Sequence, residues 1–122
     1  MRSIMVVDDD TFCLSSVKEM LSPHYRVALL ISPLKALDAV QKLKPDLVIT
    51  DYSMPELNGD ELIERLKADP LTAELPIIAI SGGDLNSLAA QRSLAAGARA
   101  YLKKPVEPKT LLGAIDACLA VD

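Results

Sequence analysis

The sequence predicts an α/β fold, a doubly wound, five-stranded parallel sheet with helices on both faces, built as (βα)5. Five short apolar runs alternate with five amphipathic segments along the 122 residues. Runs that are apolar at nearly every position are typical of parallel strands, because both faces of such a sheet are buried. Neither a linker-like stretch nor an internal repeat interrupts the pattern. We therefore expect residues 1–122 to form a single domain.

Each expected strand is an apolar run that a turn signal or a helix-capping residue ends. Ser32-Pro33 reads as an N-cap followed by proline at the first helical position, and Gly97 reads as a C-terminal cap. The expected strands are 4–7, 25–31, 47–49, 77–80 and 100–103, and the expected helices are 11–21, 33–43, 60–68, 84–96 and a last one from Pro108 onward.

Helical spacing of apolar residues predicts which side chains face the core. The expected inward residues are Leu14, Val17 and Leu21; Ala36, Leu37, Val40 and Leu43; Leu62, Ile63 and Leu66; and Leu111, Leu112, Ile115, Cys118 and Leu119.

Polar side chains follow four of the expected strands. Asp8 and Asp9 follow the first strand, Asp51 the third, Ser81 the fourth and Lys104 the fifth. Ligands of open parallel sheets bind outside the carboxyl ends of the strands. We therefore expect these residues, which are far apart in sequence, to meet at one edge of the sheet.

The residue types in this cluster favour phosphate chemistry with a divalent cation. Three neighbouring carboxylates repel one another and are tolerated when a hard cation such as Mg²⁺ lies among them. Lys104 adds a positive charge and Ser81 a hydroxyl, and both suit phosphate oxygens. A carboxylate that attacks phosphorus forms an aspartyl phosphate.

Four sequence pieces resemble the receiver domain of two-component response regulators, and together they span nearly the whole chain. They are residues 6–10 (VVDDD), residues 51–59 (DYSMPELNG), residues 79–82 (AISG) and residues 97–105 (GARAYLKKP). Each piece is weakly diagnostic, whereas all four in order are highly specific. The resemblance implies the flavodoxin-like strand order 2-1-3-4-5.

The resemblance also implies a role for each acidic residue. Asp51 corresponds to the phospho-acceptor. Asp9 corresponds to the direct Mg²⁺ ligand after the first strand, and Asp8 acts through a metal-bound water. The backbone carbonyl of Ser53 corresponds to a further protein ligand. Asp10, by contrast, is expected to cap the first helix.

Lys104 matches the lysine of the family because it immediately precedes Pro105, and the peptide bond between them is typically cis there. Ser81 takes the position of the hydroxyl residue that turns toward the phosphoryl group. Tyr101 takes the position of the aromatic residue that responds. Ser81 and Tyr101 are therefore the predicted switch residues.

The fourth helix is the expected output face. In the family's packing, Ala90 and Leu94 would face the sheet, and Leu85 and Leu88 would lie outside as a partner-docking patch. The opposite phasing, with Leu85 and Leu88 buried, stays open. Asp84 is the expected cap of this helix.

Small residues at three positions depart from the usual pattern of the family. Val106 replaces a common aromatic residue, and Ser53 and Gly83 replace larger side chains. These departures leave the essential groups in place and bear on the rate of dephosphorylation.

The expected function is a phosphorylation-dependent signalling switch rather than a conventional enzyme. Its expected partners are a sensor histidine kinase or phosphotransfer protein and a downstream effector. One alternative is a Mg²⁺-dependent phosphatase of the haloacid-dehalogenase type with Asp8 as nucleophile, although Phe12 breaks its motif. Another is a receiver-like interaction module without phosphorylation. A nucleotide-binding domain is disfavoured because the first strand leads into acids instead of a glycine-rich loop.

Charge and hydropathy argue against other classes of protein. The net charge of −4 and the pI near 4.9 argue against direct binding of nucleic acid. The sequence has neither an apolar run of membrane-spanning length nor a signal-peptide pattern, so a cytoplasmic location without membrane contact is expected. Cys13 and Cys118 are expected to be reduced, buried thiols, and His24 a surface loop residue.

Overall fold

The computed structural model describes residues 1–120, which form five strands and five helices in strict alternation. The strands are β1 (Ser3–Val7), β2 (Arg26–Leu30), β3 (Leu47–Asp51), β4 (Ile77–Ser81) and β5 (Ala100–Lys103). The helices are α1 (Thr11–Leu21), α2 (Pro33–Leu43), α3 (Gly59–Ala68), α4 (Leu88–Ala96) and α5 (Pro108–Leu119).

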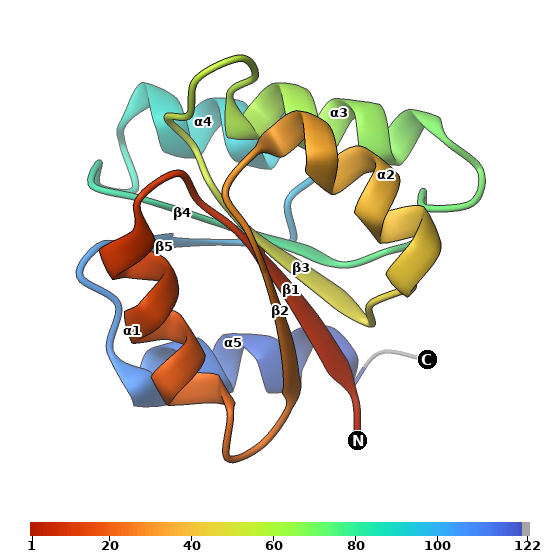
Figure 1. Ribbon diagram of the computed structural model, residues 1–122. Helices are drawn as coiled ribbons and strands as arrows, with labels where there is room; N and C mark the ends of the chain where they lie inside the picture. Colours follow the sequence, from red (N-terminus) through yellow and green to blue (C-terminus); the bar gives the residue numbers. More distant parts are fainter. Residues whose placement is uncertain (121–122) are drawn as a thin grey trace.

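All strand pairs are parallel, and the sheet has the order β2-β1-β3-β4-β5 (Figure 1). Both the parallel (βα)5 class and the order 2-1-3-4-5 are confirmed. The central strands β1 and β3 pair directly, with Val7 beside Thr50. This pairing brings the residues that follow β1 close to the end of β3.

Helices cover the sheet on both faces, with α2, α3 and α4 on one side and α1 and α5 on the other (Figure 1). Each side has its own core. Met5, Val48 and Ala79 point into the first core, and Ile4, Ile49 and Ile78 point into the second. Strand residues therefore alternate between two buried faces, which explains why the strands are apolar at nearly every position.

Strand and helix bounds agree with the sequence prediction to within one or two residues, except at α4. This helix begins at Leu88, with Ser87 as its N-cap, instead of near Asp84. The Ser87 hydroxyl accepts a hydrogen bond from the Ala90 N–H, whereas the Asp84 carboxylate accepts one from Asn86 in the preceding turn. The prediction that Asp84 caps the helix was therefore wrong.

Two expected core leucines are exposed. Leu43 ends α2 with 57% of its surface accessible, and Leu94 on α4 has 46% accessible. The α4 residues that face the sheet are Ala90 and Ser93. The helix is thus rotated relative to the expected stripe of Ala90 and Leu94, and it buries two small side chains in place of a leucine.

Candidate functional site

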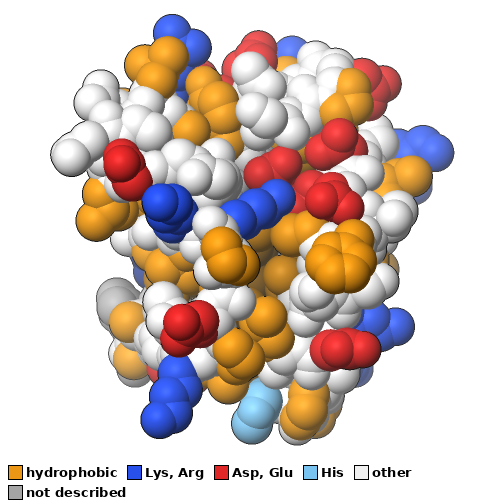
Figure 2. All heavy atoms as spheres, turned by 90° about the vertical axis from the view of Figure 1, so that its left-hand side faces the viewer, with side chains coloured by type: hydrophobic (Ala, Val, Ile, Leu, Met, Phe, Trp, Pro, Cys, Tyr) orange, Lys and Arg blue, Asp and Glu red, His pale blue; other side chains and the backbone are white. Residues whose placement is uncertain are grey.

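The carboxyl edge of the sheet gathers the acidic residues that follow β1 and β3. Asp8 follows β1 and is completely buried, while Asp51 ends β3 with 7% of its surface accessible. Asp9, beside Asp8, is exposed. Each of these three carboxylates offers an oxygen within 4.8 Å of the others. On this face of the molecule, acidic and basic side chains meet near the centre (Figure 2).

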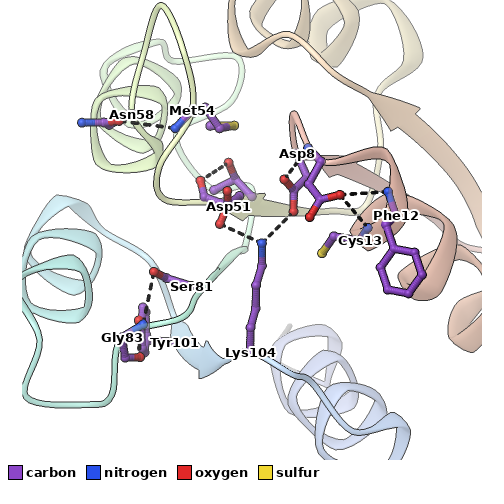
Figure 3. Close-up of polar contacts among 12 residues, drawn as sticks. Asp8, Phe12, Cys13, Asp51, Met54, Asn58, Ser81, Gly83, Tyr101 and Lys104 are labelled. Atoms are coloured by element: carbon purple, nitrogen blue, oxygen red, sulfur yellow. Dashed lines mark hydrogen bonds and ion pairs between the residues drawn. The ribbon is translucent and has the colours of Figure 1, made fainter.

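Lys104 reaches into the acidic cluster from the segment after β5 and lies between two carboxylates (Figure 3). Its Nζ lies 3.0 Å from Asp8 Oδ2 and 3.1 Å from Asp51 Oδ1. The neighbouring Lys103, by contrast, is exposed to solvent. The Lys104–Pro105 peptide bond is cis, as the resemblance implied.

The charges of the cluster are strongly coupled. Burial raises the pKa of the Asp51 carboxyl above its usual value, and the negative charge of Asp8 raises it further, while Lys104 opposes both effects. Burial of the ammonium acts to lower the pKa of Lys104. The hydrogen bond to Asp8 and the charge of Asp51 outweigh this effect and raise the pKa of Lys104. One cation therefore offsets part of the repulsion between two buried acids.

Asp10 has a structural position beside the cluster. Its carboxylate accepts hydrogen bonds from the N–H groups of Phe12 and Cys13 and caps α1, as predicted. Its own N–H donates to Asp8 Oδ1 at 3.0 Å. Because Lys104 binds the other oxygen, both oxygens of the buried Asp8 are engaged within the protein.

Two residues that contact the backbone of Asp51 were not predicted from the sequence. The Thr50 hydroxyl is buried and donates to the Asp51 carbonyl at 3.0 Å. Gly59, the first residue of α3, lies so close that a Cβ there would overlap the Asp51 carbonyl oxygen. The Asn58-Gly59 pair indicates a turn, and that signal alone does not show the close approach.

The β4 side of the site contains the predicted switch residues. Ser81 is half-buried at the end of β4, and its hydroxyl accepts a long hydrogen bond of 3.5 Å from the Gly83 N–H. Tyr101 is 6% exposed and donates its hydroxyl to the Gly83 carbonyl at 2.6 Å (Figure 3). Gly83 thus joins the two switch residues.

The remaining candidate residues differ in where they lie relative to the cluster. Ser53 is exposed in the turn after β3, where its proposed backbone role stays a prediction, and Tyr52 is half-buried beside it. Cys13 is a free, half-buried thiol. Burial and a hydrogen bond to Asp8 raise the pKa of Cys13 to about 12, so it is not a thiolate nucleophile near neutral pH. His24 is exposed in the turn between α1 and β2, well away from the carboxyl edge.

The donor set fits Mg²⁺. Hard carboxylate oxygens are the ligands that Mg²⁺ prefers, and the ion usually keeps several waters, so few protein ligands suffice. Asp8, Asp9 and Asp51 form a group of carboxylates close enough to share one cation, and the exposed Asp9 keeps the group open to solvent. Among residues 1–120, none of the helices combines the length and apolar character needed to cross a bilayer.

The fold and the site define the class of protein, a doubly wound α/β domain whose buried carboxylates and lysine meet at the carboxyl edge of the sheet. Comparison with known proteins identifies the family within that class. The sequence model described as "Response regulator receiver domain" matches residues 4–116. The chain therefore belongs to the response regulator receiver domain family of two-component signalling.

Individual relatives agree with this assignment. The chain is 33% identical to Protein PilH of Pseudomonas aeruginosa over 98% of this chain and 99% of PilH. It is 32% identical to the phosphate regulon regulatory protein PhoB of the same species over 97% of this chain, but it spans only 52% of PhoB. It spans 18% of the Arabidopsis thaliana response regulator ARR21, with 37% identity.

Solved structures show the same fold. A response regulator from Chloroflexus aurantiacus superposes with a TM-score of 0.91 at 31% identity, and 98% of each chain is covered. The Vibrio cholerae chemotaxis protein CheY4 gives a TM-score of 0.89 at 28% identity over 98% of this chain and 99% of CheY4. The receiver domain of the Pseudomonas aeruginosa kinase PA1611, described with magnesium in its active-site cleft, shares the fold at 24% identity and a TM-score of 0.89.

Proposed function

We propose that this protein is a phosphorylation-dependent switch that accepts a phosphoryl group on Asp51 in a Mg²⁺-dependent reaction. The observation that carries the proposal is the position of Lys104 Nζ, 3.0 Å from Asp8 and 3.1 Å from Asp51. A cation held between a completely buried acid and an acid at the open end of a central strand is suited to receive a phosphate oxygen beside Asp51.

Asp51 is better placed as nucleophile than Asp8. Asp8 is completely buried, and both of its oxygens already accept hydrogen bonds, from Asp10 and Lys104. Asp51 retains accessible surface at the end of β3. In the reaction, an Asp51 oxygen bonds to phosphorus as the bond between phosphorus and its donor atom breaks. This assignment disfavours the haloacid-dehalogenase alternative, which requires Asp8 to attack.

The other residues of the site bind and orient the transferred group. Lys104 would neutralise one phosphoryl oxygen, and the Ser81 hydroxyl would donate to another. Asp8, Asp9, Asp51 and the Ser53 carbonyl would hold Mg²⁺. When bound, the ion would supply positive charge that offsets the carboxylates and the phosphoryl oxygens.

The proposed output side is the surface of α4. Leu85 and Leu88 are 70% and 57% exposed, which removes the alternative in which the helix buries them. A charge on Asp51 that attracts the Ser81 hydroxyl would remove the acceptor of the Gly83 N–H. Gly83 also accepts the hydrogen bond of Tyr101, so α4 would respond. The proposed partners are a sensor histidine kinase or phosphotransfer protein and a downstream effector protein.

Phosphorylation by a small phosphodonor tests the proposal. The protein is incubated with the donor and Mg²⁺, and intact mass spectrometry counts the added phosphoryl groups. Wild type is expected to gain one group, and Asp51→Asn none. Asp10→Asn keeps a helix-capping side chain beside the cluster and should behave as wild type. Phosphorylation of Asp51→Asn together with its loss in Asp8→Asn would instead establish the phosphatase alternative.

A further inference from the structure

Strand β2 forms one edge of the sheet and pairs with β1 alone among residues 1–120 (Figure 1). The Arg26 N–H donates to the Arg2 carbonyl, and the Leu30 carbonyl accepts from the Asp8 N–H, so these two peptide groups face β1. Alternate residues of a strand direct their peptide groups to opposite sides. Val27 and Leu29 therefore present N–H and carbonyl groups outward along the open edge.

Apolar side chains flank this edge on both faces of the sheet. On the face covered by α1, Leu29 is 36% exposed and Ile31, just past the strand, is 60% exposed. On the opposite face, Leu34 of α2 is 44% exposed and Leu43 is 57% exposed. Leu30 and these two leucines line a hollow of about 560 Å³, together with Ala39 and the charged side chains of Lys35, Asp38 and Lys42. Four of the exposed large apolar residues thus border a single strand.

The other edge of the sheet is protected, and β2 is not. Strand β5 is only four residues long and ends in the exposed Lys103, and lysine on an edge strand discourages pairing with another chain. Strand β2 has five residues without lysine, proline or glycine, and its one charge, Arg26, lies at its start. An unprotected apolar edge is a template for a further strand.

We propose that this edge binds a second copy of the chain, with the two β2 strands antiparallel about a two-fold axis at Leu29. Outward-facing groups then pair with outward-facing groups, so that Leu29 opposes Leu29 and Val27 opposes Ile31 of the second copy. The ten strands form one continuous sheet. The surface includes neither the side chains of the acidic cluster nor the exposed leucines Leu85 and Leu88.

Charge complementarity favours a second copy as the occupant. Arg26 lies at the start of β2 and is exposed. At the other end, the hydroxyl of Ser32 donates to the carboxylate of the exposed Glu56 at 3.1 Å. Antiparallel pairing about Leu29 places Arg26 opposite Ser32 of the second copy, on the same face of the sheet. Arg26 of each copy thus lies close to Glu56 of the other copy. The two-fold axis relates these two contacts, so two identical copies form both of them.

The test is the mass in solution of wild type and edge variants, measured by light scattering across a dilution series. Wild type is expected to approach twice the monomer mass of 13.1 kDa at high concentration, and Leu29→Lys should stay monomeric. Leu85→Lys, which changes an exposed leucine near α4, should dimerise as wild type. Asp51→Asn should also dimerise, because the interface does not depend on phosphorylation.

A charge exchange tests the antiparallel geometry, even if Leu29→Lys fails to fold. Arg26→Glu and Glu56→Arg each place like charges together twice and should raise the dimer dissociation constant about tenfold. The double variant restores opposite charges and should recover wild-type dimerisation. A wild type that stays monomeric at every concentration would overturn the proposal. Double-variant dimers as weak as those of the single variants, or dimers lost in Leu85→Lys, would also overturn it.

Discussion

The two sides of the acidic cluster are built differently. On the β1–β3 side, Asp8 and Asp51 are buried and joined by Lys104 through contacts of 3.0 and 3.1 Å. On the β4–α4 side, the Ser81 hydroxyl and the Gly83 N–H are 3.5 Å apart. On the first side, attraction between Lys104 and the two carboxylates holds the charged groups in place. On the second side, the hydrogen bond between Ser81 and Gly83 is long and therefore weak.

Helix α4 extends this difference. It has nine residues, and only Ala90 and Ser93 are buried among them. The buried Ser93 hydroxyl has no hydrogen-bond partner among residues 1–120, and an unsatisfied buried hydroxyl reduces stability. In contrast, α3 buries Leu62, Ile63 and Leu66. A binding side that is rigid and a responding side that is lightly held are what a switch requires.

The largest expected effect is on the rigid side. Lys104→Met leaves Asp8 buried beside Asp51 without a cation, and it should lower the free energy of unfolding in metal-free buffer by about 2–3 kcal/mol. Lys103→Met changes an exposed neighbour and should cost less than about 0.5 kcal/mol. Urea denaturation measures both. Equal stabilities for the two variants would show that the ion pairs do not hold the cluster together.

The pH dependence of the free energy of unfolding tests the raised pKa of Asp51. Because the folded-state pKa of Asp51 is raised, the unfolded chain ionises first as the pH increases. In metal-free buffer, wild type should therefore lose stability relative to Asp51→Asn as the pH rises from the ordinary value of 3.8 through the raised pKa. Below that window the difference should no longer change with pH, because the Asp51 carboxyl is protonated in both the folded and the unfolded chain. A pH-independent difference in urea denaturation would contradict the coupling.

Metal binding should depend most on Asp9. Asp9→Ala should weaken Mg²⁺ binding at least about tenfold, because a proposed direct ligand is lost. Asp8→Ala should weaken binding less, in keeping with a water-mediated role. Asp10→Ala is the matched control and should lose about 1 kcal/mol of stability through its cap without changing Mg²⁺ affinity. Calorimetric titration compares them, and equal affinities in all three variants would contradict the ligand assignment.

On the lightly held side, Gly83 offers a sharper test than its sequence position suggested. The sequence relates Gly83 only to the rate of dephosphorylation, but a Cβ there would lie 2.6 Å from the hydroxyl of Ser87, the cap of α4. Gly83→Ala should thus lower stability by about 1 kcal/mol through the displaced cap while phosphorylation proceeds. Gly82→Ala meets no atom within 4 Å and is the control. Equal midpoints of thermal unfolding for Gly83→Ala and Gly82→Ala would show that a side chain at Gly83 does not disturb the cap.

The smallest effect on the fold is expected on the surface of α4. Leu88 is 57% exposed, so Leu88→Asp should change stability by less than about 0.5 kcal/mol and leave phosphorylation intact. It should reduce binding of the effector to the phosphorylated protein. Leu71→Asp alters a leucine that is 82% exposed elsewhere and serves as control. Undiminished binding by Leu88→Asp in an affinity measurement would exclude α4 from the output surface.

The strands were predictable because a buried parallel strand is apolar throughout, as Leu47–Asp51 shows up to its acidic end. The start of α4 was not, because Asp84 and Ser87 are both good caps and the sequence does not rank them. Leu43 shows the same limit at a helix end, where an apolar residue continues the pattern without packing into the core. Leu94 shows that the sequence did not fix the rotation of α4 about its axis.

The cluster itself was predictable from a rule of topology, since the ends of parallel strands share one edge. The individual contacts around the cluster were not predictable. The Tyr101–Gly83 hydrogen bond and the close approach of Gly59 to Asp51 depend on loop paths. The exposure of Leu29 follows from the position of β2 at the edge, which the composition of that strand does not reveal.

The most direct measurement of the central claim is the response of backbone amides to beryllofluoride and Mg²⁺, a mimic of the aspartyl phosphate, followed by NMR. Large shifts are expected at Asp51 and Ser81 that continue through Gly83 and Tyr101 into α4, whereas Asp51→Asn should show only the shifts that Mg²⁺ alone causes near Asp8 and Asp9. Shifts confined to Asp8, Asp9 and Asp51, with α4 unchanged, would contradict a switch in which the rigid side of the site drives the lightly held one.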